Sequence, residues 1–470
     1  MKTMSAIFAA IVAVIVFAAC NGPTNSSGEV ITVTVDGIDR ISVTPPVKTS
    51  YSQSGFFSSA GLVVKAHYTD GSVVTVNEGY SLYWNGQPLS NGNTAITGQL
   101  GDKIISVDWR GKTASFTVYV SNENTLPVTN TDQWNYALSF IRDGGNHRDY
   151  TITVNGNVPV SGSTDNTFGT TTDLTITLNG NGKLYLDSPG NMIRLTDDQT
   201  LYIDGPTLEG LIIDANGATQ NNNAALVYIN SATAKLELQK GMISGNTNPS
   251  GDGGGVYVNG GGSFTMSGGT ISGNAGNYGG GVYNRGNFSM MEGTISGNSG
   301  NGGGVFVNNG SFTMSGGFVR DNAGGGVFVY SSGSFTMSGG TVSGNTSTSN
   351  GGGVYVNNNG SFTMSGGFVS GNTSTYTGTI ASYGGGGVYV YTNGSFSKSG
   401  GGIIYGNDTT VEEDKNTASG SGFRGQAVYY YVSTSTIYYR DTTLDTGDDI
   451  STTGSLPTTS GQTDGGWTRR

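Results

Sequence analysis

The sequence predicts an all-β protein in which a parallel β-helix, with coils of about 23 residues, follows a small β-sandwich. Three observations support this fold class. Glycine makes up 81 of 470 residues and charged residues only 11%, against ordinary values of about 7% and about 25%. The segment Gly-Ser-Phe-Thr-Met-Ser-Gly-Gly recurs in the second half of the chain. Ahead of this repeat, residues 30–120 alternate between apolar and polar positions, which is typical of half-buried strands.

Composition excludes several kinds of function. The net charge is −11 and no long run of either sign occurs, so we expect no nucleic-acid partner, because such binding needs clustered Lys and Arg. The single cysteine, Cys20, excludes an internal disulfide. The two histidines, His67 and His147, lie far apart and argue against a histidine-based metal site or triad. We therefore expect no metal and no cofactor.

The first residues predict export. A short basic start precedes an apolar run over 6–19, which is too short for a membrane span but suits a signal peptide over residues 1–19. The run ends in Phe17-Ala-Ala-Cys20, which resembles the lipobox of bacterial lipoproteins. That resemblance implies an acylated Cys20 and a chain anchored to a bacterial membrane, at the outer membrane or cell surface. The alternative is an ordinary secreted protein with a chance cysteine.

A polar tether and a sandwich come next. Residues 20–28 form a flexible Gly/Pro/Ser/Asn segment after the lipidated cysteine. Residues 29–121 then read as a series of strands separated by turns, with a hairpin turn at Asp70-Gly71. The expected strands are 31–35, 61–68, 73–76, 103–109 and 114–120. The segment resembles the bacterial Ig-like domains of surface proteins, which implies a spacer or a binding module.

The repeat decides the architecture. Its phenylalanines are spaced 24, 24, 23, 27 and 34 residues apart. Each unit offers three short strands, for example 256–258, 264–266 and 270–272, which can bury a face only by stacking on the next unit. We expect one interior Phe column, a Met column two residues on, and a ladder of corner asparagines. The Phe column is Phe264, Phe288, Phe312, Phe335, Phe362 and Phe396, and the asparagines are Asn274, Asn298, Asn322, Asn345, Asn372 and Asn407.

The ends of the solenoid are predicted from the flanking segments. Residues 122–149 hold a linker and a helix over 130–142, placed to cap the first coil. The β-helix is expected over 150–441. Residues 442–470 are polar and are expected to form a disordered tail.

The repeat resembles the right-handed, pectin-lyase-like β-helices of bacterial adhesins and polymorphic outer-membrane proteins, through its Gly-Gly-Gly-Val unit and its Phe followed by Asn. The resemblance implies a β-helical adhesin or stalk. Two alternatives stay open, a polysaccharide-active enzyme of this fold and a purely structural surface component.

The enzyme alternative depends on suitably placed carboxylates, because glycoside hydrolysis needs two that oppose each other. The charged candidates are Arg320 and Asp321, predicted to be a solvated corner pair, and Asp187, Asp197, Asp198, Asp204 and Asp214, predicted to lie in solvated turns. We therefore predict no catalytic residues.

A second aromatic column is expected on the outside. In the Val-Tyr-Val strands the valines match the interior period, so the middle ring should point outward. The rings are Tyr257, Tyr283, Phe306, Phe328, Tyr355 and Tyr389. Our hypothesis is that they bind a glycan or a protein on a host or another cell, because exposed aromatic stripes are costly unless used. The alternative is that they only stiffen the rod.

Overall fold

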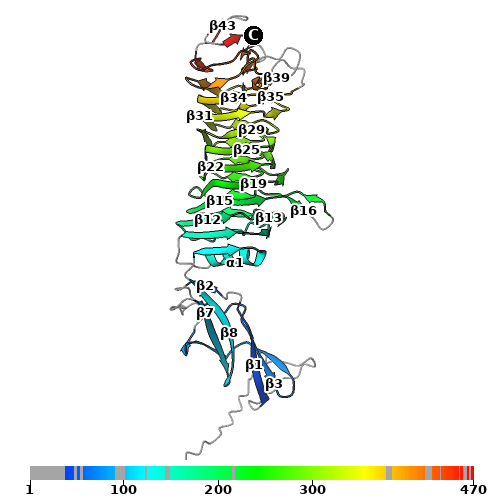
Figure 1. Ribbon diagram of the computed structural model, residues 1–470, viewed down its shortest axis with the longest axis vertical. Helices are drawn as coiled ribbons and strands as arrows, with labels where there is room; N and C mark the ends of the chain where they lie inside the picture. Colours follow the sequence, from blue (N-terminus) through cyan, green and yellow to red (C-terminus); the bar gives the residue numbers. More distant parts are fainter. Residues whose placement is uncertain are drawn as a thin grey trace, which may run out of the picture. The chain divides into compact units, whose positions relative to one another are not determined.

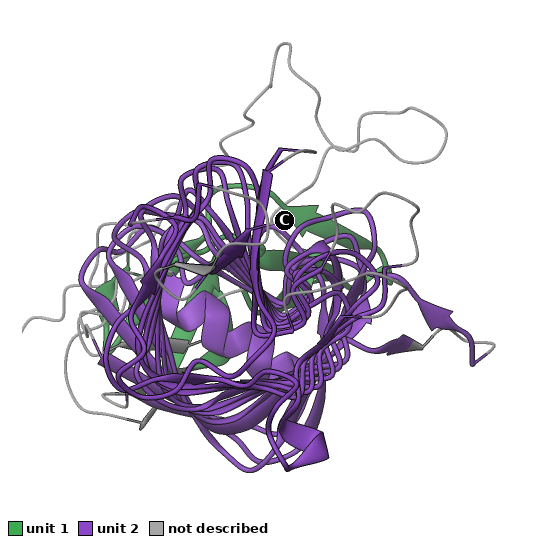
Figure 2. Cartoon of the chain, turned by 90° about the horizontal axis from the view of Figure 1, so that it is seen from above, with its two compact units in different colours: residues 1–122 green, residues 123–470 purple. Residues whose placement is uncertain are grey.

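The computed structural model describes residues 37–46, 50–52, 57–89, 101–121, 124–142, 149–213, 217–376, 384–418, 426–433, 436–454, 456–458, 463–464 and 467–469. The predicted signal peptide, Cys20 and tether lie outside these residues. The chain divides into two compact units, residues 1–122 and 123–470 (Figure 2). Within the described residues, no helix combines the length and apolar character that a membrane crossing requires.

Unit 1 contains two small sheets that share one hydrophobic core. The first sheet is β1 (Ile38–Thr44), β3 (Val63–Tyr68) and β4 (Val73–Val76), and the second is β2 (Ser50–Ser52), β8 (Lys112–Ser121), β7 (Gly101–Trp109), β5 (Ser81–Trp84) and β6 (Gln87–Pro88). Val64 of the first sheet and Ile105 and Val118 of the second are buried in the same cluster. The predicted hairpin at Asp70-Gly71 is confirmed, since it joins β3 to β4 in antiparallel pairing. The strand expected at 31–35 lies outside the described residues.

Unit 2 is a parallel β-solenoid, with about 9 turns over residues 125–374 (Figure 1). The fold class predicted from the repeat is confirmed. The larger sheet has 16 strands: β9 (Thr125–Val128), β10 (Asp149–Val154), β11 (Asn157–Ser161), β12 (Leu174–Gly180), β13 (Lys183–Ser188), β15 (Gln199–Glu209), β19 (Lys235–Ser244), β22 (Ser263–Ser272), β25 (Asn287–Ser296), β28 (Ser311–Met314), β29 (Phe318–Arg320), β31 (Ser334–Ser343), β34 (Ser361–Ser370), β37 (Ser395–Lys398), β38 (Ile403–Ile404) and β42 (Ile450–Ser451).

A second sheet of 12 strands runs along the solenoid beside the first. It consists of β14 (Ile193–Leu195), β18 (Val227–Ile229), β21 (Val256–Val258), β24 (Val282–Asn284), β27 (Val305–Asn308), β30 (Val327–Tyr330), β33 (Val354–Val356), β36 (Val388–Val390), β40 (Val428–Ser433), β41 (Thr436–Arg440), β43 (Thr463–Asp464) and β44 (Trp467–Arg469). Short third strands are β20 (Thr247–Asn248), β23 (Ala275–Tyr278), β26 (Ser299–Asn301), β32 (Thr346–Ser347), β35 (Thr373–Ser374) and β39 (Thr417–Ala418), and one hairpin is β16 (Ile212–Ile213) with β17 (Thr219–Gln220).

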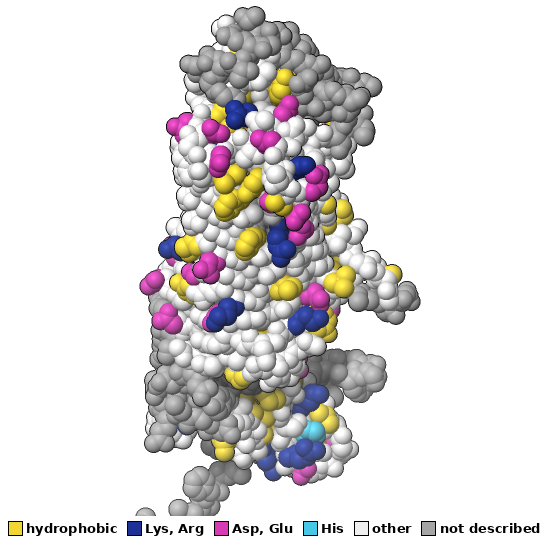
Figure 3. Space-filling model, turned by 45° about the horizontal axis from the view of Figure 1, so that its top comes forward, with side chains coloured by type: hydrophobic (Ala, Val, Ile, Leu, Met, Phe, Trp, Pro, Cys, Tyr) yellow, Lys and Arg dark blue, Asp and Glu magenta, His cyan; other side chains and the backbone are white. Residues whose placement is uncertain are grey.

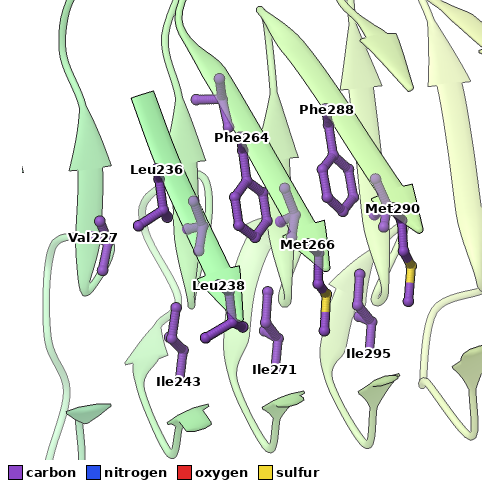
Figure 4. Close-up of a cluster of buried hydrophobic side chains, with 14 of the residues drawn as sticks. Val227, Leu236, Leu238, Ile243, Phe264, Met266, Ile271, Phe288, Met290 and Ile295 are labelled. Atoms are coloured by element: carbon purple, nitrogen blue, oxygen red, sulfur yellow. The ribbon is translucent and has the colours of Figure 1, made fainter. Parts of the chain in front are cut away.

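The interior Phe column is confirmed. Parallel pairing places Phe264 opposite Phe288 and Phe288 opposite Phe312, and the ladder continues to Phe396. Neighbouring ring centroids lie 4.7, 4.6, 4.7, 4.8 and 5.3 Å apart. Figure 4 shows the first two of these rings, Phe264 and Phe288, beside Met266 and Met290, with Ile271 and Ile295 beneath them. Stacked coils thus bury like residues on like residues.

The bounds of the strands within a coil differ from the prediction, although several coils still have three strands. The segments 264–266 and 270–272 are joined in one strand, β22, with a bulge between Met266 and Thr270. Gly268 permits the close approach there, since a Cβ at this position would lie 2.1 Å from the carbonyl oxygen of Gln239 in the preceding coil. The bulge turns the strand around a corner of the coil without ending its ladder.

The asparagine ladder is confirmed over most of its length. Asn298 donates from its backbone N–H and from Nδ2 to Oδ1 of Asn322, at 3.0 Å in each case. The other Nδ2 hydrogen bond of Asn298 goes to the carbonyl oxygen of Ile271 in the preceding coil. The last predicted member is wrong, because Asn407 is exposed and Asn372 instead donates to Asn416.

A helix caps the first coil, as predicted. Helix α1 (Thr131–Arg142) buries Trp134, Leu138 and other apolar residues in the same cluster as the solenoid interior. Its start is fixed by a reciprocal cap: Oδ1 of Asn130 accepts from the N–H of Gln133, and Oε1 of Gln133 accepts from the N–H of Thr129.

The expectation of a disordered tail over 442–470 is wrong for its described parts. Leu444, Ile450 and Trp467 are buried in the solenoid core, and β42 pairs antiparallel with β37. Lys398 follows the Met column in register, and it is 1% exposed. Its Nζ donates to the carbonyl oxygens of Gly400, Asp445 and Asp448. The segment around Leu444 therefore closes the last coil on a buried ammonium group.

Candidate binding surface

The candidate site residues form a second aromatic ladder outside the core, which we call the outer ladder. In β21, Val256 and Val258 are fully buried in the solenoid core, and the ring of Tyr257 between them lies outside that cluster. The same alternation holds in the strands that follow, because successive strand residues point to opposite faces. Described residues extend the ladder by one ring at each end. Its members are Tyr228, Tyr257, Tyr283, Phe306, Phe328, Tyr355, Tyr389 and Tyr429.

The rings of the outer ladder touch from coil to coil. Neighbouring centroids lie 4.9, 4.9, 5.5, 4.8, 4.4, 5.2 and 5.5 Å apart in chain order. Their interplanar angles range from 7° for Tyr389 and Tyr429 to 76° for Tyr355 and Tyr389. Both stacked and edge-to-face pairs are favourable geometries, so the ladder is continuous although its rings are not parallel.

Exposure along the ladder is uneven. Tyr257, Phe328 and Tyr355 are half-buried, whereas Tyr283, Phe306 and Tyr389 are 4%, 3% and 0% exposed. The six rings predicted to point outward thus do not form a uniformly exposed stripe. Side chains beside the ladder cover three of them. Near the C-terminal end Tyr389 and Tyr429 are buried with Ile437, against Tyr355, Tyr391, Tyr431 and Tyr439.

A pocket of about 260 Å³ opens in the middle of the ladder, and we call it the ladder pocket. It is lined by Asp252, Tyr278, Tyr283, Phe306, Asn308, Phe328 and Tyr330. The ring of Phe306, one of these lining residues, lies 4.8 Å from the ring of Tyr278 and 6.0 Å from the ring of Tyr330, centroid to centroid. Asp252 precedes β21 and Asn308 ends β27, so polar groups approach the rings from both ends of the strands.

A polar network crosses the ladder pocket. Nδ2 of Asn308 donates to the hydroxyl of Tyr283 over 2.7 Å, and that hydroxyl hydrogen-bonds to the carboxylate of Asp252. Burial raises the pKa of Asp252 above its ordinary value, against the opposing effects of this hydrogen bond and of Arg285. Burial also raises the pKa of Tyr283 to about 12. The carboxylate is therefore partly removed from water and has acceptor capacity left.

Amide and guanidinium groups recur beside the ladder. Nδ2 of Asn357 donates to the hydroxyl of Tyr355 over 3.0 Å, as Asn308 does to Tyr283. Arg285 hydrogen-bonds to Tyr257, and this contact raises the pKa of the guanidinium. At the first ring, the guanidinium carbon of Arg194 lies 4.7 Å from the centroid of Tyr228. Polar partners thus accompany the rings over several coils.

The carboxylates considered for catalysis do not converge in the described residues. Arg320 and Asp321 form an exposed ion pair at 3.3 Å, which confirms the predicted corner pair. Asp204 pairs with Lys240 at 3.0 Å, and Asp197 accepts from the Ser231 hydroxyl. Asp214 lies outside the described residues. Of the residues that the structure describes, no three acidic, His or Cys side chains are grouped to hold a metal ion. In the face that Figure 3 presents, charged groups lie singly or in small groups on a largely uncharged surface.

The ladder pocket contains residues that the sequence did not single out. Tyr278 and Tyr330 are aromatic residues at positions where neighbouring coils carry Asn301 and Asn308. That exchange of Asn for an aromatic residue within the repeat is the signal that could have identified them. Comparison with known proteins adds no further assignment, because the sequence matches no protein-family profile and no curated protein significantly.

Proposed function

We propose that this protein is a lipid-anchored bacterial surface protein whose β-solenoid acts as a non-catalytic adhesive stalk. In this proposal Cys20 carries the lipid, unit 1 is an Ig-like spacer, and unit 2 belongs with the adhesin-type β-helices that its repeat resembles. The outer ladder is the adhesive surface, and its ligand is a glycan. The single observation that supports this function is the aromatic ladder outside the solenoid core, which runs through eight rings.

The chemistry of the ladder favours a glycan. Aromatic rings offer flat apolar faces, while the hydroxyls of Tyr283 and Tyr355 with their Asn partners offer hydrogen bonds at the ring edges. A sugar ring presents the same two kinds of surface, an apolar face and a hydroxyl-bearing edge. Binding sites of this kind combine aromatic lining with a few placed polar groups.

The test replaces the half-buried rings. The ladder variant carries Ser in place of Tyr257, Phe328 and Tyr355. We expect it to abolish adhesion of protein-coated beads to a panel of immobilised polysaccharides. The matched control changes Met291, Phe318 and Phe368 to Ser, because these side chains are exposed, apolar and on the larger sheet. Both variants should keep a β-rich circular dichroism spectrum. Adhesion retained by the ladder variant, or lost equally by the control, would contradict the proposal.

The anchor is tested separately. Cys20→Ser should leave the precursor unprocessed or release the protein into the soluble fraction. Detergent partitioning and the mass of the mature N-terminus measure this. A variant that is processed at the same site and still partitions into detergent would contradict the lipoprotein assignment.

A further inference from the structure

The outer ladder changes character along its length. At Tyr389 and Tyr429 its rings are buried among further tyrosines, and Tyr389 is fully buried. In the middle, the ladder pocket opens beside Phe306. A ligand that needs contact with ring surface and with polar groups together finds both at this pocket.

We propose that the ladder pocket is the primary subsite of the ladder and that it binds one neutral sugar residue in preference to an acidic one. The inference rests on the proposed function and deepens it, since it names the coil that binds and the class of sugar. The floor is made by Tyr283, Phe306 and Phe328, of which the first two are only 4% and 3% exposed. The ring surface that a ligand can reach belongs to Phe328, Tyr278 and Tyr330, and Asp252 and Asn308 supply polar groups at the rim.

Size supports a single sugar residue. The pocket volume of about 260 Å³ lies just below the lower limit of sites for drug-sized ligands, which is about 300 Å³. The pocket spans strands of three successive coils, β24, β27 and β30, which bear the rings of the floor. The neighbouring rings, Tyr257 and Tyr355, lie on either side of it along the same ladder. A longer oligosaccharide can therefore continue from the pocket along the rod.

Charge favours a neutral sugar. Among the described residues that line the pocket, none is Lys or Arg, and the one charged group is the carboxylate of Asp252. A uronic or sialic acid would bring a second negative charge beside a carboxylate that is already partly desolvated. An organic cation is disfavoured as well, because Arg285 lies close enough to lower the pKa of Asp252. A neutral sugar meets neither repulsion, and its hydroxyls can donate to the carboxylate.

The experiment uses the full-length protein on an array of neutral, uronic-acid-terminated and sialic-acid-terminated oligosaccharides, with choline as a soluble competitor. Wild type should bind neutral glycans, and affinity should be measured by calorimetry with the tightest of them. Asp252→Asn and Asn308→Ala should each weaken that affinity about tenfold, as expected for a lost charge-assisted or network hydrogen bond. Asn287→Ala is the matched control, because it removes an exposed amide that hydrogen-bonds across coils on the larger sheet, away from the outer ladder and the ladder pocket, and it should change affinity less than about twofold.

The outcomes separate this inference from the proposed function. One outcome would overturn the pocket proposal alone. In it, neutral-glycan binding survives Asp252→Asn and Asn308→Ala but is lost in the variant with Ser in place of Tyr257, Phe328 and Tyr355. Preference for acidic glycans, or displacement of a bound glycan by choline, overturns the assigned sugar class. Absence of binding to every glycan on the array overturns both proposals. Circular dichroism and melting temperature of each variant exclude loss of binding through unfolding.

Discussion

Two aromatic ladders run along the same coils, and they differ in order. Inside, the first five Phe rings are nearly parallel, with interplanar angles of 6°, 7°, 7° and 8° between neighbours. Outside, the angles between neighbours are 62°, 44°, 13°, 65°, 16°, 76° and 7°. Coil spacing alone therefore does not set the orientation of a ring.

The difference lies in what surrounds each ring. Phe264 and the rings stacked on it are buried among the Met, Val and Ile columns of the interior, which leave one rotamer (Figure 4). The neighbours of the outer rings differ from coil to coil, since Tyr389 is buried among further tyrosines whereas Phe328 is half-buried. The comparison teaches that a repeat sequence imposes identical geometry only where the surrounding residues repeat as well. Where the neighbours vary, side chains at the same repeat position can take different roles.

The largest effect is expected from the inner ladder. Phe312→Ala should cost about 3–5 kcal/mol of local stability, because it leaves a cavity in a fully packed column. The damage should spread to neighbouring coils, since each coil is stabilised by the next. Hydrogen exchange along unit 2 measures this. Loss of protection restricted to the coil of Phe312 would contradict the coupling, and unchanged stability would contradict the packing.

The asparagine ladder should follow in size. Asn322→Ala removes the acceptor of two hydrogen bonds from Asn298 and the donor to Asn345 and Ile295. Leaving these buried groups unpaired should cost about 2–4 kcal/mol. Chemical denaturation provides the measurement. Asn407→Ala is the control, because that residue is exposed, and it should have little effect.

The buried ammonium group at the end of the Met column should rank third. Lys398→Met continues the column but leaves three carbonyl oxygens without their donor, at a cost of about 1–3 kcal/mol. Opening should be confined to residues 441–454 and the last coil, which limited proteolysis can detect. If the variant is more stable than wild type, hydrophobic continuity outweighs the capping contacts.

A smaller effect is expected from the outer ladder. Phe328→Ala should cost about 1–2 kcal/mol, because the ring is half-buried and loses mainly its contacts with Phe306 and Tyr355. Comparing the loss of stability in Phe328→Ala with that in Phe312→Ala compares the outer and inner ladders directly. Equal losses from the two substitutions would show that both ladders are structural, and would weaken the case for a binding role.

The smallest effect is a dependence on pH. Because the folded pKa of Asp252 is raised, the folded state holds its proton more tightly than the unfolded state. Stability from this group is present at low pH and is lost as pH rises from its ordinary pKa through the raised value. Asp252→Asn should remove that slope and leave the melting temperature at neutral pH equal or higher. A steeper slope in the variant would contradict the assignment.

Within the repeat, the features that the sequence predicted correctly are those in which one residue type recurs at one coil position. The inner Phe column is of this kind, because like residues stack in register. The prediction from recurrence fails where a coil contains an insertion, because the residue that follows the motif then no longer lies at the stacked position. Asn407 follows the familiar Gly-Asn pattern, but a segment before residue 416 intervenes, and Asn416 takes the ladder position instead.

The sequence predicted correctly that the rings of the candidate surface lie outside the core, but it did not predict how exposed each ring is. Alternation with buried valines was enough to place Tyr257 and its equivalents outside the core. Whether such a ring is covered depends on residues outside the motif, such as Tyr278 beside Phe306 and Tyr391 beside Tyr389. These neighbours come from corners and strand ends, where the repeat is loosest. The pocket is a product of that variation.

The closed ends of the solenoid have a consequence for its behaviour in solution. Each coil offers its backbone N–H and C=O groups to the next, so an uncovered terminal coil would be an open strand edge that any second copy could extend. Helix α1 packs against the first coil (Figure 1). At the other end, β42 pairs with β37 and Trp467 packs against Tyr430 of the last coil. Removal of either cover would turn a rod of fixed length into a template for end-to-end polymerisation. The buried ammonium group of Lys398 thus helps to set where growth of the stack stops.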